Sequence, residues 1–355
     1  MKVLLGRTPG IFGRKVYWQD GHAVVVGDQG SGAKSRIFAP VTFQVLKQVA
    51  EGGDVGLTVF DHAGVFARDI ERAAHHLQVP SVVVDQDSSK SAFWNPLEGD
   101  TETVAEAFAE VVSGDAAQEP FFQEKIRELG RNMILLLKRV AGDGVTLHDV
   151  AECLGDDYAL REAMRRYSDR VAAEDQVVRY LDTFTNSNIK RSLEFSLVSL
   201  LSTPRLKRIV CSPTSFSLLK HVEHGRQLLS VQLPLAPSQG RTLGELWWHS
   251  FERILLDPSR GAGVPHILCA DQSIACAAGQ ELLMRGRARN VRLLLATQEE
   301  QEIVSRQCGT RVCMADGRHG RANVCTGSSA SALEVLTPRI AWPGQSDATR
   351  YGLSV

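Results

Sequence analysis

The sequence has no hydrophobic run long enough to cross a membrane as a helix. No stretch approaches the ~18 consecutive apolar residues that a transmembrane helix requires. The apolar run near the start is short and is broken by Gly6 and Arg7, which is not the pattern of a cleaved secretory signal. We therefore expect a cytoplasmic protein that reaches the inner membrane only through partner subunits.

The sequence also has no excess of one charge. Lys and Arg number 40 and Asp and Glu number 41, for a formal net charge of -1. This balance excludes a strongly basic arm that binds nucleic acid by charge alone and an acidic disordered chain. Hydrophobic residues make up 43% of the 355 residues, enough for a large core in one large domain or in two or three smaller ones.

Paired cysteine motifs are absent as well. The seven cysteines are odd in number, scattered and free of CxxC spacing. This pattern favours reduced core thiols over a disulfide framework or a metal site.

Short apolar runs recur along the chain, and each is followed by a turn and a longer amphipathic segment. Continuous apolar runs of this kind are typical of strands buried on both faces, and their alternation with helical patterns predicts a mainly parallel α/β sheet. The expected strands are His22–Val26, Leu57–Phe60, Ser81–Val84, Leu228–Leu233, His266–Cys269, Val291–Ala296 and Arg311–Met314.

Between residues 98 and 203 the strand-like runs stop and helical periodicity replaces them. One apolar face runs from Phe122 to Val140 at spacings of three and four. Further helices are expected over 158–167, 174–184 and 189–201, and the pair Gly240–Arg241 is expected to lie in a loop. The chain is thus expected to hold a discontinuous α/β domain, residues 1–97 and 204–355, with an inserted all-α domain at 98–203.

The segment from His22 to Pro40 has the order of a phosphate-binding loop. A strand is followed by Gly27-Asp28-Gln29-Gly30-Ser31-Gly32, and a helix is expected to begin near Ala33. Glycines let backbone N–H groups surround phosphates, and the helix N-terminus adds positive potential. A Lys and a Ser or Thr normally follow, for the phosphates and for Mg²⁺.

The spacing of this loop differs from GxxxxGK[ST] by one residue. Counted from Gly27, Ala33 occupies the lysine position and Lys34 the Ser/Thr position. Either the lysine is lost, or Ala33 is an insertion and Lys34 with Ser35 still forms the functional pair. The second alternative requires a local rearrangement, because one extra residue rotates a helical side chain by about 100°. A glycine-rich turn with no phosphate role is the third possibility.

A second nucleotide motif is expected at the end of the strand beginning at His266. Asp271 has the position of the Mg²⁺-associated carboxylate, and Gln272 replaces the Glu that would polarise an attacking water. Glutamine can orient a water but cannot accept its proton. Outside a nucleotide site, Asp271 would simply cap the following segment.

In this order the segments resemble the coupling ATPases of conjugation and type IV secretion, of the TraG/TraD kind within the FtsK/HerA translocase superfamily. The resemblance covers about residues 15–330 and includes Asp61-His62-Ala63-Gly64, where the family has Asp-Pro-Lys-Gly, and Asn95-Pro96-Leu97. It implies a RecA-like P-loop domain with an inserted all-α domain.

The resemblance implies ATP and Mg²⁺ as cofactors. The implied nucleotide-binding residues are Gly27, Gly30, Ser31, Gly32, Ala33, Lys34 and Ser35; the implied metal ligands are Ser35 and Asp271; and the implied catalytic residues are Asp271, Gln272 and Gln298. Gln301 is a second candidate polar sensor. The candidates for an arginine that acts on the nucleotide of a neighbouring subunit are Arg285, Arg287, Arg289, Arg306, Arg311 and Arg318.

Three functions remain open at this point. One is a hexameric ring ATPase that feeds DNA or secreted protein substrate to other secretion-system subunits, with impaired hydrolysis because of Ala33 and Gln272. Another is a pseudo-ATPase that serves such an apparatus as an adaptor without hydrolysis. An unrelated metabolic α/β enzyme is a third alternative, but the sequence offers no convincing Ser/His/Asp or metal-ligand set for it.

Overall fold

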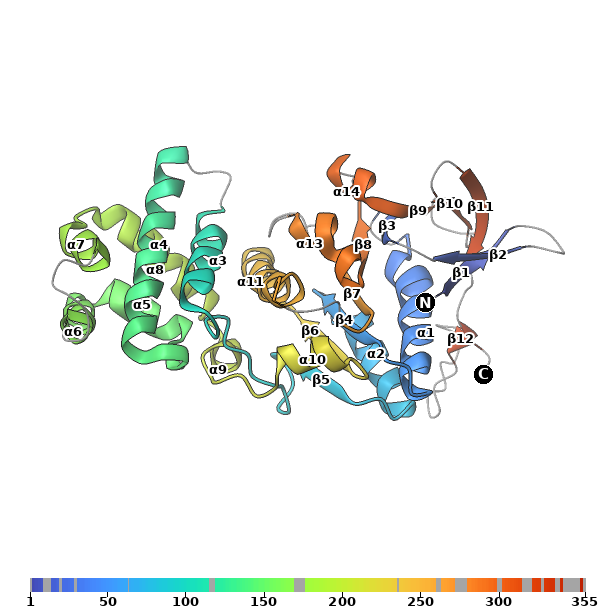
Figure 1. Cartoon of the computed structure of the whole chain (residues 1–355), viewed down its shortest axis with the longest axis horizontal. Coiled ribbons are helices and arrows are strands. Elements are labelled where there is room, and N and C mark those ends of the chain that lie inside the picture. Colours follow the sequence, from blue (N-terminus) through green and yellow to red (C-terminus); the bar gives the residue numbers. More distant parts are fainter. Residues whose placement is uncertain are drawn as a thin grey trace. The chain divides into compact units, whose positions relative to one another are not determined.

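The computed structural model of the chain describes residues 2–8, 14–18, 21–28, 31–62, 64–114, 119–168, 176–234, 236–259, 263–271, 280–298, 302–314, 321–326, 329–335, 339–340 and 352–353. The chain divides into two compact units (Figure 1). Unit 1 comprises Met1–Val83, Leu218–Leu233 and Ile254–Val355, and unit 2 comprises Val84–Ser217 and Pro234–Arg253. The expected helical insertion, 98–203, lies within unit 2, which extends beyond it on both sides.

Unit 1 is built on an eleven-stranded sheet with the order β2-β1-β11-β10-β9-β3-β8-β7-β4-β6-β5. Its strands are β1 (Val3–Arg7), β2 (Lys15–Trp18), β3 (His22–Val26), β4 (Gly56–Asp61), β5 (Ser81–Val84), β6 (Leu228–Gln232), β7 (His266–Asp271), β8 (Val291–Thr297), β9 (Cys308–Met314), β10 (Arg321–Thr326) and β11 (Ser329–Val335). Neighbouring strands are parallel in the part of the sheet with the order β9-β3-β8-β7-β4-β6. Neighbouring strands are antiparallel in the part with the order β9-β10-β11-β1-β2.

All seven expected strands are present, and the mainly parallel α/β fold class is confirmed. The four strands of the antiparallel part, β1, β2, β10 and β11, were not expected. In β1 and β2, exposed and buried positions are mixed, so neither strand stands out as a continuous apolar run. A separate small sheet pairs β12 (Arg339–Ile340) with β13 (Gly352–Leu353).

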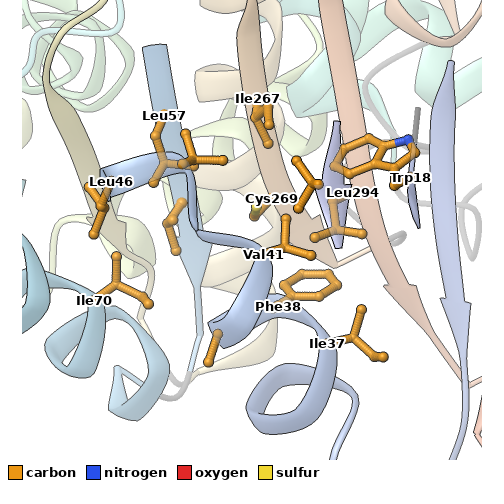
Figure 2. Packing of buried hydrophobic residues seen from close by; sticks show 14 of the residues in the cluster. Trp18, Ile37, Phe38, Val41, Leu46, Leu57, Ile70, Ile267, Cys269 and Leu294 are labelled. Carbon is orange, nitrogen blue, oxygen red and sulfur yellow. The ribbon is translucent and has the colours of Figure 1, made fainter. Parts of the chain in front are cut away.

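The core of unit 1 lies between the sheet and two helices, α1 (Ala39–Ala50) and α2 (Val65–His76). Figure 2 shows Phe38, Val41 and Leu46 from the first helical segment directed at the strands, with Ile70 from α2 beside them. Leu57 and Ile267 meet them from the sheet and are fully buried. This packing fixes where the chain enters the helix after the glycine-rich loop.

Unit 1 also has three short helices within its described residues. The helix α10 (Leu218–His224) precedes β6, and α13 (Glu281–Arg285) leads through η3 (Gly286–Arg289) into β8. The helix α14 (Glu302–Gln307) lies between β8 and β9. Within the described ranges, no helix combines the length and the apolarity needed to span a bilayer.

Unit 2 is helical throughout its described elements. They are α3 (Thr101–Ser113), α4 (Pro120–Ala141), η2 (Gly142–Gly144), α5 (Leu147–Gly155), α6 (Asp157–Ser168), α7 (Gln176–Thr183), α8 (Ser187–Leu200), α9 (Pro204–Val210) and most of α11 (Pro237–Leu255). The expected helices at 158–167, 174–184 and 189–201 correspond to α6, α7 and α8. The expected apolar face of α4 is buried from Ile126 to Leu137, but Phe122 at its start is exposed.

The expected loop at Gly240–Arg241 is wrong, because both residues lie inside α11. Gly240 donates its backbone N–H to the carbonyl of Ala236 and is buried. A single glycine is tolerated in a helix when the apolar periodicity continues past it, as it does here through Leu243 and Trp247.

The Asn-Pro-Leu segment has a structural role in unit 2. Asn95 is buried, and its amide donates to the carbonyls of Val145 and Asp143 while its side-chain oxygen accepts the N–H of Leu97. Beside it, the buried Lys138 donates to the Leu97 carbonyl and to Asp143. These contacts fasten the segment before α3 to the end of α4.

Candidate nucleotide-binding site

The candidate site lies at the carboxyl ends of five parallel strands of unit 1. β3 ends before Gly27, β4 at Asp61, β6 at Gln232, β7 at Asp271, and β8 one residue before Gln298. Ligands of open α/β sheets bind at this edge. Residues that are far apart in the sequence therefore face one region.

The glycine-rich loop is anchored to the sheet at its first residue. The N–H of Gly27 donates to the carbonyl of Thr297 at 2.9 Å. A Cβ atom at Gly27 would lie 2.6 Å from Ser31 Oγ and 2.8 Å from Met314 Cβ, so no other residue fits there. Gly32 has a φ of +86°, a conformation that glycine adopts without strain. Gly30 lies outside the described residues.

The helix after the loop begins with a π-helical segment, η1 (Lys34–Phe38), and not with regular α-helix. Its backbone bond from the N–H of Ala39 to the carbonyl of Lys34 spans five residues in place of four. A π turn holds one residue more than an α turn, and such turns occur frequently at functional sites. A turn of this kind can accommodate one residue more than GxxxxGK[ST] has.

Lys34 bridges the two strand-end carboxylates. Its Nζ lies 2.9 Å from Asp61 Oδ1 and 3.4 Å from Asp271 Oδ2. Asp61 is fully buried, whereas the side chains of Lys34 and Asp271 are 31% and 24% exposed. Burial by itself would lower the pKa of Lys34, but the charges of Asp271 and Asp61 outweigh it and raise the pKa, so the ammonium stays charged. Ala33 is half-buried and packs against the core.

Two buried polar atoms beside the loop have no hydrogen-bond partner among the described residues. They are Ser31 Oγ and Arg36 Nη1. The Arg36 side chain lies against Gly32, where its Nε is 3.1 Å from the position that a Cβ would take. Together with the Lys34 ammonium, a hydroxyl and a guanidinium are donors that suit an anionic ligand. The residues present thus fit a phosphate group.

The two residues expected to bind Mg²⁺, Ser35 and Asp271, each contact another residue of the site. Ser35 donates its hydroxyl to the Gly32 carbonyl at 3.3 Å, and Asp271 contacts Lys34. No group of three or more His, Cys, Asp or Glu side chains in the described part of the chain could hold a metal ion. Mg²⁺ in nucleotide sites usually takes only one or two protein oxygens, with the remainder from phosphates and water, so Ser35 and Asp271 remain suitable ligands.

The predicted catalytic residues are only partly described. Asp271 lies at the end of β7, and Gln298 follows β8 as an exposed residue. Gln272 and Gln301 lie outside the described residues. Their expected roles remain predictions.

Asp61 and Gln232 are two members of this region to which the sequence analysis gave no site role, although Asp61 begins one of the family motifs. The side chain of Gln232 donates to Glu71 at 3.2 Å, and its Oε1 lies 2.7 Å from the position of a Cβ at Gly64. Asp61 and Gln232 face each other across the β4–β6 pair. A polar residue that ends a mainly apolar strand was the available signal for both.

The arginine cluster before β8 lies at the opposite edge of the sheet. Arg287 and Arg289 belong to η3, which precedes the first residue of β8, whereas Gln298 follows its last. A strand of this length spans about 23 Å, so these arginines cannot reach the loop of their own chain. Arg306 and Arg311 are exposed, and Arg318 lies outside the described residues.

Solved structures with a similar fold are known, although comparisons of the sequence find no relative. No family model matches the chain, and no curated protein matches it. A structure of the bacterial conjugative coupling protein TrwBdeltaN70 with sulphate matches with a TM-score of 0.61 at 14% identity, over 88% of this chain and 85% of that one. The chain has the fold of TrwB.

Other TrwB structures match over similar lengths. The complex of the plasmid coupling protein TrwB with ADP and Mg²⁺ has a TM-score of 0.56 at 15% identity, over 89% of this chain and 78% of that one. The complex with a non-hydrolysable ATP analogue has a TM-score of 0.57 at 13% identity, over 94% and 88%. At these identities the likeness establishes the fold, and it agrees with the coupling-protein resemblance of the sequence motifs.

Proposed function

We propose that unit 1 is a P-loop nucleotide-binding domain and that the chain is an ATPase-type coupling protein of a conjugation or type IV secretion apparatus. One observation carries the proposal: Lys34 follows the Gly27–Gly32 loop closely and extends to Asp61 and Asp271 at the carboxyl edge of the parallel sheet. The TrwB fold supports it, since TrwB structures hold ADP with Mg²⁺ and a non-hydrolysable ATP analogue.

The phosphate lysine in this proposal is Lys34, and Ala33 is an inserted residue. The π turn over Lys34–Phe38 supports this alternative over loss of the lysine. The side chain of Lys34 has the charge and the strand-end carboxylate neighbours expected of that lysine, while Ala33 packs against the core. Lys34 and Ser35 then act as the shifted Lys-Ser pair.

The remaining residues take roles that follow from their chemistry. Backbone N–H groups of the loop, Gly30 included, and the Ser31 hydroxyl bind phosphate oxygens, and Lys34 neutralises their charge. Ser35 and Asp271 provide oxygen ligands for Mg²⁺. Gln298 contacts the terminal phosphate or orients water. Gln272 orients water but cannot take its proton, which predicts slow hydrolysis.

The working assembly is a hexameric ring that passes DNA or secreted protein substrate to other secretion-system subunits. An arginine from the cluster before β8 would act on the neighbouring protomer, because it lies too far from its own loop. Such a protein would work in the cytoplasm and reach the inner membrane through its partners. The alternative function, a pseudo-ATPase adaptor of the same apparatus, is favoured by Gln272 alone.

Equilibrium binding of Mg-ATP, measured by calorimetry, tests the nucleotide site. We expect wild type to bind and Lys34→Ala to lose most of its affinity, whereas Lys47→Ala, at an exposed lysine of α1, keeps it. Deleting Ala33 restores GxxxxGKS spacing and should preserve or strengthen binding. Absence of binding by wild type at millimolar ATP would refute the proposal, and loss of binding on deletion of Ala33 would refute the insertion.

Turnover separates the motor from the adaptor. If the chain is a motor limited by its missing general base, Gln272→Glu should raise steady-state phosphate release by roughly 10²-fold or more, because general bases typically contribute ~10²–10⁴-fold. An adaptor specialised for binding should gain no turnover from the same change while still binding Mg-ATP.

A further inference from the structure

Asp61 is held in one position by the fold. It ends β4, is fully buried, and its Oδ2 accepts the backbone N–H of Ala67 at 3.1 Å in the first turn of α2. The residue at the N-cap of α2, Gly64, has no side chain to cap that helix, so Asp61 supplies a cap from the end of the strand. The carboxylate cannot leave this place without opening the turn between β4 and α2.

A buried carboxylate needs a cation, and Lys34 is the cation that Asp61 contacts. Their 2.9 Å separation is shorter than the 3.4 Å from Lys34 to Asp271. Removing a buried charge from its partner is costly, because the remaining charge stays in a low-dielectric environment. Lys34, in contrast, has a flexible stem and is about one-third exposed.

A nucleotide phosphate would require the same ammonium. We propose that Asp61 is a positioning residue, which holds Lys34 at the sheet edge and competes with a nucleotide phosphate for its charge. The inference rests on the nucleotide site proposed above and adds a residue that sets the affinity of that site for nucleotide. Each binding event must weaken the contact between Lys34 and Asp61, so this pair sets how readily the loop takes a phosphate.

The competition predicts a change of affinity in an unusual direction. Asp61→Asn keeps the shape of the side chain and an oxygen that can accept the Ala67 N–H, but it removes the negative charge. Lys34 is then freed for phosphate, and we expect Mg-ADP to bind more tightly by roughly two- to fivefold, the range of a partly exposed ion pair. A residue that serves only to cap α2 would give unchanged or weaker binding.

The experiment is calorimetric titration of Mg-ADP into wild type, Asp61→Asn and Asp54→Asn. Asp54 is an exposed aspartate that precedes β4 and pairs with Arg226, so its variant removes one charge away from the site and should bind as wild type does. Asp61→Ser, with a small neutral side chain, provides a second test if Asp61→Asn folds poorly, and it too should bind more tightly.

The two Asp61 variants separate the possible outcomes. Unchanged or weaker Mg-ADP binding by both Asp61→Asn and Asp61→Ser would overturn the role of Asp61 alone. No binding of Mg-ADP by wild type would overturn the nucleotide site itself, and this inference with it.

Discussion

Mild acid should unfold unit 1, because three of its histidines are buried as neutral rings. His22 donates from Nε2 to the Leu283 carbonyl and accepts the Leu293 N–H at Nδ1, so neither nitrogen has room for a further proton. His221 and His266 each place Nε2 2.9 Å from the Thr58 hydroxyl. That hydroxyl donates to one ring and accepts from the other, so the ring that accepts must be neutral.

Burial lowers the pKa of all three rings. The pKa of His22 falls to about 4, with Arg287 adding to the effect, and the pKa of His221 falls to about 3. The pKa of His266 also lies well below its ordinary value, because of burial and the neighbouring His221. Because these values lie below the ~6.5 of an unfolded histidine, the unfolded chain binds more protons, and stability is lost as the pH falls below about 6.5.

The loss can be worked out for two of the three rings. Linkage between an unfolded pKa of ~6.5 and the lowered folded values gives about 2 kcal/mol at about pH 5 for each of His22 and His221. The two rings together give about 4 kcal/mol, a large part of the whole stability of a typical domain, about 5–15 kcal/mol, and the lowered pKa of His266 adds to the loss.

Urea unfolding followed by circular dichroism at about pH 7.5 and about pH 5 measures this loss. Hydrogen exchange in peptides that cover β4 and β7 would assign it to unit 1. His221→Gln keeps a partner for Thr58 and should reduce the loss of stability at about pH 5 by about 2 kcal/mol, whereas His75→Gln, at an exposed position, should leave the pH dependence unchanged. A free energy of unfolding that stays flat down to about pH 5 would refute the reasoning.

One substitution in each unit tests a buried contact: a close backbone approach in unit 1 and a hydrogen bond in unit 2. Gly56→Ala places a Cβ 2.2 Å from the Nδ1 of His266 and should lower the free energy of unfolding by about 2–3 kcal/mol. The control, Gly144→Ala, has no atom near its Cβ position and should change the free energy of unfolding by less than about 0.5 kcal/mol. Equal effects of the two variants in urea melts would contradict the close contact between Gly56 and His266. Asn95→Ala leaves the buried Val145 carbonyl without its donor and should cost about 1–3 kcal/mol, and an unchanged melting midpoint would show that this contact does not hold unit 2 together.

The parallel half of the sheet could be predicted from the sequence because its strands are buried on both faces. Residues 23–26 of β3 and 228–231 of β6 are apolar or small, and such runs are visible without any partner. In β1 and β2 the exposed Arg7 and Lys15 face each other across the pair. Strands of that kind are defined by their pairing, which sequence periodicity cannot supply.

The candidate site was predictable in its members but not in its contacts. Asp271 and Lys34 were named from their motifs, yet nothing in the sequence indicated that Asp61, 27 residues after Lys34, would be the nearer carboxylate. Which strand lies beside β7 depends on the strand order, and β4 takes that place. Sheet order therefore decides which charges share a site.

The proposed insertion of Ala33 agrees with the described contacts on either side of it. Before Ala33, the Gly27 N–H is bound to Thr297, and contact with Met314 leaves no space to shift the loop. After it, Phe38 and its neighbours are buried in the core, so the helix cannot rotate by one residue. If Ala33 is the inserted residue, as we propose, the π turn over Lys34–Phe38 is where the helix accommodates it. Deletion of Ala33 should therefore convert this turn to regular α-helix and leave Lys34 facing the same carboxylates.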